Sequence, residues 1–403
     1  MPAWAAALAS FASGRALEPS DILAYSTGPL VIRTHCTASQ QFTDNVLYSS
    51  ARQISDYVAV FKPSVAFSVG KPDSQTFITL AYRASSHLYG QQRQFDSLDH
   101  SARLELELQG AKLTLAGRFE LQDVSSVYGG YSSFIQAGTG QAQGLGALAF
   151  DRIIYNLHQK VEYSYKPKTT IYAEGHYNGL DFRRRVDALD IDTVRATLGF
   201  SWLAFPKTRI LGELFSGQTS SGPNAAGVLK SPHVNSLGGY IGAEGSFTSK
   251  MKGVLKIGFE QSAYASGLSA LSSPVVEAEV SEEFSEKTSA KLNYSRRSTL
   301  SITSSGQAVV SDFASAQISQ VIGTRSKFVA TAATGYGHNE YAPLGRLRAR
   351  SDDYFRGAAE LLYRHRLWLS VGLAYEFESL LTRPSAGFDY QVNRVSITLT
   401  VGY

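Results

Sequence analysis

The chain has 403 residues, and its composition excludes several broad classes of protein. A mean hydropathy of −0.12 is too polar for a helical membrane protein, and the sequence contains no run of about 18 apolar residues that could form a transmembrane helix. The single cysteine, Cys36, excludes an internal disulfide framework, and a net charge of +4 without a recognition motif gives no support for nucleic acid as a partner. The 22 Tyr, 21 Phe and 35 Gly residues indicate a β-rich chain with many turns.

The first 16 residues are mostly small and apolar, with Ala-Ala-Ala-Leu-Ala at positions 5–9. Such a stretch is typical of the apolar part of a secretory signal, and residues 7–9 offer a cleavage site. No basic leader precedes it, so an alanine-rich tail is the alternative interpretation. We expect a truncated signal peptide at 1–16 and a periplasmic segment at 17–28.

From residue 30 onward, segments that alternate apolar and polar residues recur between turn signals. Successive side chains of a strand point to opposite faces, so this alternation predicts strands with one apolar and one polar face. About 18 strands are expected, and most are long enough for the roughly 9–11 residues that a tilted membrane strand needs. They are residues 30–40, 56–69, 76–89, 99–108, 111–124, 149–165, 169–180, 191–205, 208–220, 233–248, 251–265, 274–284, 288–300, 312–322, 326–341, 352–365, 367–380 and 388–403.

The links between these segments alternate in length. Short turns are expected at residues 109–110, 166–168, 206–207, 249–250, 285–287 and 366, and longer links at 181–190, 221–232, 301–311 and 342–351. Short periplasmic turns on one rim and long extracellular loops on the other are typical of outer-membrane barrels. The prediction is therefore an all-β fold, in which residues 29–403 form a single transmembrane antiparallel up-and-down β-barrel in the bacterial outer membrane.

The charged residues of these segments fall on one face. A charge on the lipid face costs about 2–4 kcal/mol at mid-bilayer, so the charged face must point to water, which here is the lumen. A wall with both signs suits hydrated, hydroxyl-rich solutes; alternatively, the charges pair across strands and keep the barrel rigid. The candidate lumen-lining residues are Arg103, Glu105, Glu107, Arg118, Glu120, Arg152, Lys160, Glu162, Glu174, Arg195, Glu213, Lys256, Glu260, Arg356, Glu360, Glu376 and Arg394.

The stretch at 124–150 contains no charged residue and is rich in Gly, Ser and Gln. As the third long loop it is expected to fold inward and narrow the pore, as in many porins. A mobile external loop is the alternative. The candidate constriction residues, whose types stack on sugars and hydrogen-bond to them, are Tyr128, Tyr131, Phe134, Gln136, Gln141 and Gln143.

Aromatic and basic residues gather near the predicted strand ends. The aromatic ones favour the headgroup level of a membrane, although they are also ordinary strand formers. They are Tyr89, Tyr163, Tyr165, Trp202, Phe205, Phe284, Tyr341 and Tyr403. The basic residues at 183–185 and Arg346, Arg348 and Arg350 are expected either to meet the phosphates of lipopolysaccharide or to form a solvated loop face.

The last segment, 388–403, alternates regularly and ends on Tyr403. A final strand with a terminal aromatic residue is the assembly signal of outer-membrane barrels, which implies the barrel-assembly machinery as a partner. Val395, Ile397, Leu399 and Val401 should face lipid. The strand should pair with residues 30–40, because closing the barrel removes both sheet edges.

No catalytic or metal motif is present. The sequence contains neither a Gly-x-Ser-x-Gly elbow nor His-Glu-x-x-His, and its eight histidines lack metal-ligand spacing. His158 and His176 share the predicted lumen face with Ser164 but are expected to be inert. We predict no enzyme activity, no metal and no cofactor.

Both ends of the chain resemble a known family. Gly-Pro-Leu-Val-Ile at 28–32, Phe-Thr-Asp-Asn-Val-Leu-Tyr at 42–48, Pro-Ser-Val at 63–65 and Tyr-Gln-Val-Asn-Arg-Val-Ser-Ile at 390–397 are similar to the outer-membrane β-barrel porin family associated with exopolysaccharide export operons. The resemblance implies an exit pore for secreted polysaccharide that works with periplasmic export proteins, without catalytic residues.

Three functions follow from a wide barrel, since 16–18 strands leave an aqueous channel. The leading one is a conduit for exopolysaccharide export. The alternatives are a general diffusion porin for small hydrophilic solutes and a plugged structural barrel that holds a periplasmic or extracellular partner. A soluble β-sandwich or propeller is the competing fold.

Overall fold

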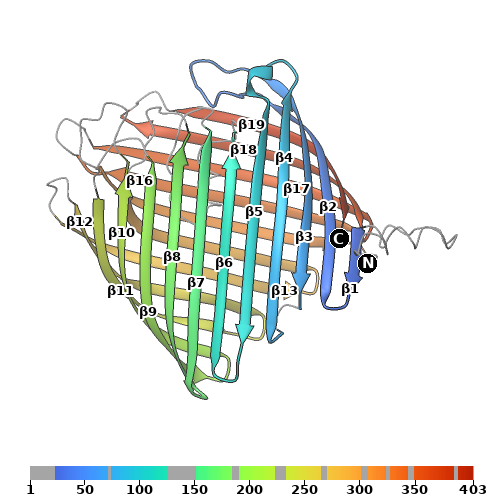
Figure 1. Ribbon diagram of the computed structural model, residues 1–403. Helices are drawn as coiled ribbons and strands as arrows, with labels where there is room; N and C mark the ends of the chain where they lie inside the picture. The colour runs from blue at the N-terminus through green and yellow to red at the C-terminus, as the bar shows by residue number, and fades with distance from the viewer. Residues whose placement is uncertain are drawn as a thin grey trace.

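A computed structural model describes residues 23–70, 74–125, 151–183, 190–222, 233–264, 270–300, 307–323, 327–343, 349–384 and 389–402. Within these residues the chain forms one closed antiparallel barrel of 18 strands, β2 to β19, and a short extra strand, β1 (Figure 1). No helix of the described part is long and apolar enough to cross a membrane. The predicted all-β barrel is confirmed.

Each barrel strand pairs with its neighbour in the sequence, and the strand bounds lie close to those predicted. The strands are β2 Leu30–Thr43, β3 Asp56–Val69, β4 Thr76–Tyr89, β5 Ser97–Gln109, β6 Leu113–Val124, β7 Arg152–Lys166, β8 Thr169–Phe182, β9 Ile191–Phe205, β10 Thr208–Ser221, β11 His233–Ser246, β12 Met251–Tyr264, β13 Leu271–Ser285, β14 Thr288–Leu300, β15 Ala308–Ile322, β16 Phe328–Tyr341, β17 Arg350–Arg366, β18 Leu369–Arg383 and β19 Tyr390–Gly402.

Strand β19 closes the barrel against β2, as the alternation of the last segment predicted. The register runs from Arg394 opposite Thr43 to Gly402 opposite His35. Closure satisfies the backbone N–H and C=O groups of both edges, which hydrocarbon cannot do. Tyr403, the predicted assembly signal, lies outside the described residues.

Strand β1, Ala24–Thr27, was not predicted. It folds back on the start of β2, with Ala24 opposite Arg33 and Thr27 opposite Leu30, and Gly28 in the turn has a φ of +58°. Four residues are too few to show an alternating pattern, and the strand exists only because β2 offers an edge to pair with. In Figure 1 it lies beside the barrel wall, close to the N-terminal label.

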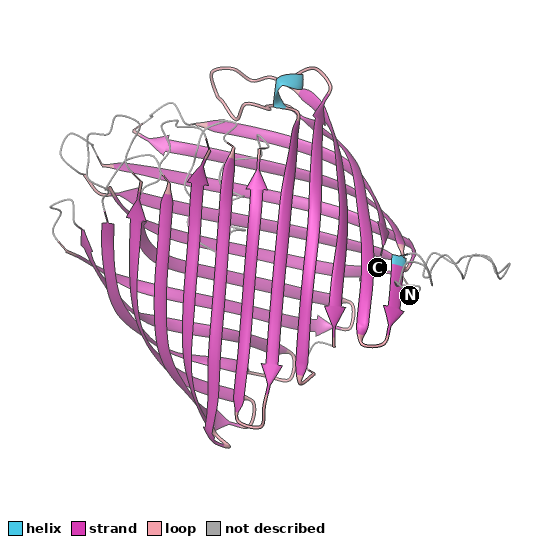
Figure 2. Ribbon diagram, in the orientation of Figure 1, coloured by secondary structure: helices cyan, strands magenta, loops and turns pink. Residues whose placement is uncertain are grey.

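Tight hairpin turns such as residues 206–207 and 286–287 close one end of the barrel, and the described links 44–55 and 90–96 lie at the other (Figure 2). Two predicted turns were misplaced. Gln109 is the last residue of β5, so the turn predicted at 109–110 lies at 110–112. Arg366 is the last residue of β17, and the turn is formed by Leu367 and Trp368, so that Leu367 is 94% exposed. The strand predicted at 367–380 therefore starts at Leu369, because Leu367 and Trp368 form the turn.

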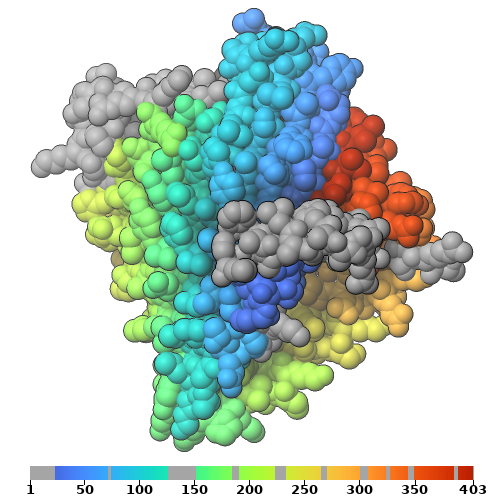
Figure 3. Space-filling model, turned by 45° about the vertical axis from the view of Figure 1, so that its right-hand side comes forward, coloured from blue at the N-terminus to red at the C-terminus, as the bar shows by residue number. Residues whose placement is uncertain are grey.

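Large apolar side chains cover the outside of the barrel. Leu198, Leu214 and Phe259 are 67–70% exposed, and Val395, Ile397 and Leu399 of β19 are also exposed. Within the described residues, the buried apolar side chains form only small clusters. In Figure 3 the side chains of neighbouring strands lie against one another along the cyan and green part of the wall. A soluble sandwich would bury such side chains between its sheets, whereas a barrel in lipid exposes them.

Five tyrosines on the outer face share one geometry. Each lies on a strand that runs from the rim with the short turns toward the opposite rim. Its hydroxyl lies 2.7 Å from a polar atom of the next strand in the sequence. The residue with that polar atom is two positions closer to the opposite rim than the residue paired directly with the tyrosine. The pairs are Tyr82–His100, Tyr177–Asp192, Tyr294–Asp312, Tyr336–Asp353 and Tyr375–Asn393. Rings in lipid with hydroxyls held toward water form an aromatic girdle at the outer interface.

The aromatic residues that the sequence suggested for this role divide into two groups. Tyr163, Tyr165, Trp202, Phe205 and Phe284 are exposed next to the short turns, as an inner girdle requires. Tyr341 was assigned wrongly: it is 2% exposed, because the Arg350 guanidinium lies 3.9 Å from its ring centre.

Substitutions of two neighbouring residues of β19 test which face of the strand lies in lipid and which lies in the lumen. Ile397→Arg places a charge at the middle of the lipid face, whereas Thr398→Arg places the same charge in the lumen. We expect Ile397→Arg to lower the free energy of unfolding by about 2–4 kcal/mol, measured by urea titration in lipid vesicles, and Thr398→Arg to have a much smaller effect. Equal losses in the two variants would contradict the assignment of the faces.

Candidate functional site

All 17 candidate lumen residues lie on described strands. On each strand they alternate with the exposed apolar side chains, as Arg195 does with Val194 and Lys256 with Leu255 and Ile257. The register therefore places them together on the inner wall. Whether they contact a solute is a prediction that their position alone does not test.

A cavity of about 260 Å³ opens on the inner wall between β8 and β15. Its charged lining residues carry both signs, and the remaining ones include hydroxyl and amide side chains. The charged residues are Glu174, Arg195, Glu213, Lys256, Glu260, Glu277 and Arg297, and the polar ones include Asn178, Ser236 and Tyr240. These are the groups that bind hydrated solutes by hydrogen bonds and local charge.

Partners fix most of these charges in place. The Lys256 ammonium lies 2.8 Å from Glu213, which also accepts a 2.7 Å hydrogen bond from the Tyr172 hydroxyl. The Arg195 guanidinium lies over the Phe215 ring, 3.6 Å from its centre. The cross-strand pairs that one sequence interpretation expected are present, and such pairs stiffen the wall and also set its local electric field.

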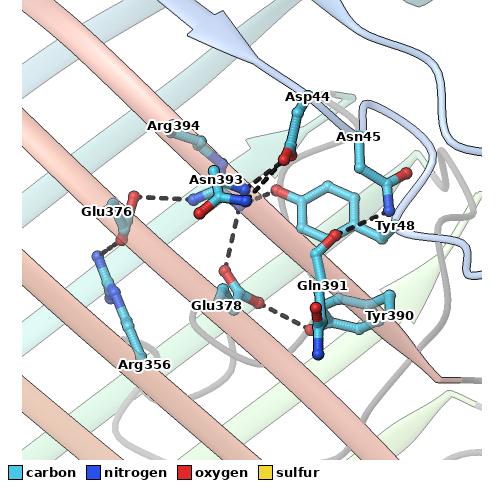
Figure 4. Close-up of polar contacts among 10 residues, drawn as sticks. All are labelled: Asp44, Asn45, Tyr48, Arg356, Glu376, Glu378, Tyr390, Gln391, Asn393 and Arg394. Carbon is cyan, nitrogen blue, oxygen red and sulfur yellow. Dashed lines mark hydrogen bonds and ion pairs between the residues drawn. The ribbon is translucent and has the colours of Figure 1, made fainter.

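A network of charged side chains, several of them buried, lies on β17, β18 and β19 (Figure 4). Arg394, 4% exposed, donates to Glu376 at 2.8 Å and to Glu378 at 3.1 Å. The Tyr390 hydroxyl donates to the other Glu378 oxygen at 2.8 Å, and Arg356 pairs with Glu376. Glu378 is fully buried, and a buried carboxylate is unfavourable unless it is paired and hydrogen-bonded, as it is here.

The link between β2 and β3 packs on the inside of this network. The Arg394 guanidinium donates to the Tyr48 hydroxyl, and the Tyr48 ring stands edge-on to Tyr390 with centroids 5.2 Å apart. Asn45, fully buried, donates to the Gln391 carbonyl at 2.9 Å and to the Ser49 carbonyl at 3.0 Å. Tyr48 adopts a φ of +48°, an uncommon conformation for a residue with a Cβ, and this packing compensates for it.

Sequence reasoning missed this inward-folded link. It placed the inward loop at 124–150, and Tyr128, Tyr131, Phe134, Gln136, Gln141 and Gln143 lie outside the described residues. The signal was present, because the 42–48 motif that carried the family resemblance contains Asn45 and Tyr48. Neither residue has a strand pattern or a charge, so nothing in the sequence indicated a partner near residue 394.

The basic residues expected at the outer rim have different surroundings. Arg183 pairs with Asp123 at 2.7 Å, whereas residues 184–185, Arg346 and Arg348 lie outside the described part. Arg350 is not a loop residue: it begins β17, where its Nε lies 3.2 Å from Asp352. Binding of lipopolysaccharide and of the barrel-assembly machinery stays a prediction.

The buried network provides a test of stability. Arg394→Ala leaves the buried Glu378 without its cationic partner, whereas Glu376 keeps Arg356. Removing one partner of a buried ion pair typically costs about 3–5 kcal/mol. We expect a loss of this size in urea titrations in vesicles. Arg118→Ala is the control, because the Arg118 side chain is 56% exposed and its pair with Glu105 should contribute at most about 1 kcal/mol. Similar losses would mean that burial does not govern these pairs.

Comparison with known proteins agrees with the barrel. Residues 228–403 match the model of a family described as "Putative beta-barrel porin 2". No curated protein matches the chain.

Solved structures of outer-membrane proteins are similar at low identity. OpdK of Pseudomonas aeruginosa is 10% identical, with a TM-score of 0.47 over 92% of this chain and 99% of that chain. OccK2 (OpdF) of Pseudomonas aeruginosa in complex with glucuronate is 10% identical, with a TM-score of 0.47 over 92% and 98%. OccAB3 of Acinetobacter baumannii is 11% identical, with a TM-score of 0.45 over 92% and 99%. With TM-scores below 0.5, these similarities carry no argument about what this chain transports.

The family match and the closed barrel with its apolar outer face agree on one conclusion. This protein is a porin-like β-barrel channel of the bacterial outer membrane.

Proposed function

We propose that the channel lets small hydrophilic solutes diffuse across the outer membrane. The observation that carries the proposal is the mixed-charge cavity between β8 and β15. Its lining holds four carboxylates, those of Glu174, Glu213, Glu260 and Glu277, and three cationic groups. A wall with nearly equal numbers of positive and negative groups attracts polar and zwitterionic solutes without strongly favouring cations or anions.

The inward-packed link supports a small solute rather than a thick polymer. The segment that contains Asn45 and Tyr48 occupies space inside the barrel along β17 to β19. Eighteen strands alone would enclose a wide aqueous channel, and a segment against the inner wall reduces its width. The cavity lies on a different part of the wall, between β8 and β15. The remaining path through the barrel is therefore narrowed by the link and lined on the cavity side by polar residues.

Exopolysaccharide export, with periplasmic export proteins as partners, is the second candidate. The strand number favours it, since a barrel of 18 strands has room for an extended polymer. The description of the matching family names a porin and no polymer.

Two measurements separate these candidates. Purified protein in planar bilayers should give discrete ion conductance with weak preference for cations or anions, and proteoliposomes should swell in monosaccharides and disaccharides but not in long oligosaccharides. Swelling in long oligosaccharides, with loss of surface polysaccharide in a deletion strain, would support export instead. Absence of conductance would support a plugged scaffold.

Adjacent residues of β11 test whether the cavity belongs to the path. Ser236 lines the cavity, whereas Leu237 is 64% exposed on the outer face. Ser236→Trp should lower single-channel conductance by about a third or more, because an indole occupies much of a cavity this size. Leu237→Trp, which adds the same ring on the lipid side, should leave conductance unchanged. Unchanged conductance in both variants would place the path elsewhere.

A further inference from the structure

Two histidines and a glutamate meet on the inner wall at the hairpin of β7 and β8. His158 lies directly opposite His176, and Glu174 is the next inward-facing residue on β8. One potential ligand atom from each of His158, Glu174 and His176 lies within 4.8 Å of the other two. The spacing of the histidines in the sequence did not reveal this group, because the hairpin brings together residues 18 positions apart.

We propose that these three residues form a binding site for a divalent transition-metal ion, of which Zn²⁺ is the expected occupant. Two imidazoles and one carboxylate are a common ligand set for zinc, with the remaining position open to water. In tetrahedral zinc sites the ligand atoms lie about 3.3 Å apart, which follows from bonds of about 2.0–2.1 Å. The ligand atoms of the present cluster lie within 4.8 Å of one another, so the side chains rotate to reach this spacing when an ion binds.

The state of His158 is the second observation. Its Nε2 atom is buried and, within the described residues, has no hydrogen-bond partner. The two imidazole rings are stacked, with centroids 4.2 Å apart and planes 10° apart, so they do not bond to each other edge to edge. A buried nitrogen without a partner is unfavourable, and coordination of a metal ion would satisfy it.

The charges around the cluster leave its ligand atoms available. Lys160 contacts one Glu174 oxygen at 3.1 Å, while the other Glu174 oxygen faces His176 Nε2 at 3.5 Å. Lys160 also pairs with Glu162 at 2.7 Å, so it keeps a partner when Glu174 turns to a metal ion.

The flanking cations are also held by other groups. Arg118 is opposite His158 and pairs with Glu105 at 2.8 Å, and Arg195 is opposite His176 and lies over the Phe215 ring. Neither guanidinium has to move for an ion to bind.

A bound ion would lie on the wall of the solute cavity, because Glu174 and His176 also line it. Its positive charge would shift the channel toward anions. This consequence rests on the proposed function, whereas metal binding itself does not.

Binding is tested on the full chain, refolded in detergent and freed of metal with a chelator. Isothermal titration with zinc chloride should give one site per chain, and excess Mg²⁺ should not compete, since Mg²⁺ prefers oxygen ligands. Absence of saturable zinc binding, or full displacement by Mg²⁺, would overturn the proposal.

Variants assign the site to these residues. His158→Gln, His176→Gln and Glu174→Gln keep polar side chains of similar size, and each should weaken zinc binding by at least about tenfold because a site of three protein ligands loses one. His100→Gln is the matched control, since His100 lies on the outer face beside Tyr82, and its affinity should match that of the unmodified chain. Heat-modifiable migration on gels establishes that each variant is folded. Unchanged affinity in the folded cluster variants would also overturn the proposal.

A separate readout keeps this proposal distinct from the proposed function. In planar bilayers, zinc should shift the reversal potential toward anion preference for the unmodified chain and not for His176→Gln. Zinc binding without conductance would sustain the metal site and reject the diffusion channel. Conductance without zinc binding would do the reverse.

Discussion

The backbone pairing of β19 with β2 is the constraint on which the rest of the structure depends. A membrane interior offers no hydrogen bonds to a free strand edge, so the sheet must close or remain outside the bilayer. Closure also fixes the register, because a shift of one residue would turn every inward side chain of a strand to the lipid. The observed register keeps Arg394 inside and Val395 outside, and the same alternation continues through the other strands. The polar wall and the apolar outer surface are therefore two results of one pairing.

Charged side chains in the lumen lose hydration when they are buried, and the structure shows two arrangements that limit this loss of free energy. Near the water-filled space, pairs such as Arg118 with Glu105 stay partly exposed and contribute little to stability. On β18 and β19 the pair of Arg394 with Glu378 is buried, and Glu378 also accepts a hydrogen bond from the Tyr390 hydroxyl. The buried network also anchors Tyr48, which comes from the link between β2 and β3 at the opposite end of the sequence. The network thus couples the barrel seam to the segment that narrows the lumen.

Much of the fold could be predicted because a membrane barrel is constrained locally. Each strand must alternate its two faces, and each hairpin needs turn residues, so segments such as 56–69 and 191–205 were predicted with the bounds that the structure has. Errors arose where this local pattern stops: β1 is too short to alternate, and the turn after β17 lies one residue beyond its predicted place. The aromatic girdles were predicted in kind, but Tyr341 faces Arg350 and not lipid, because an alternating pattern does not show which neighbour shields a side chain.

By itself, the sequence determined the strand number, the alternation of short and long links, the pairing of the last strand with the first and which face of each strand is charged and which is apolar. It did so because these features depend on residues adjacent in the chain or on its two ends. Only the tertiary structure decided which side chains meet: Tyr48 with Arg394, Lys256 with Glu213, and His158 with Glu174 and His176. These contacts depend on register and on side-chain packing across strands, and residues far apart in the chain carry no local pattern that reveals them.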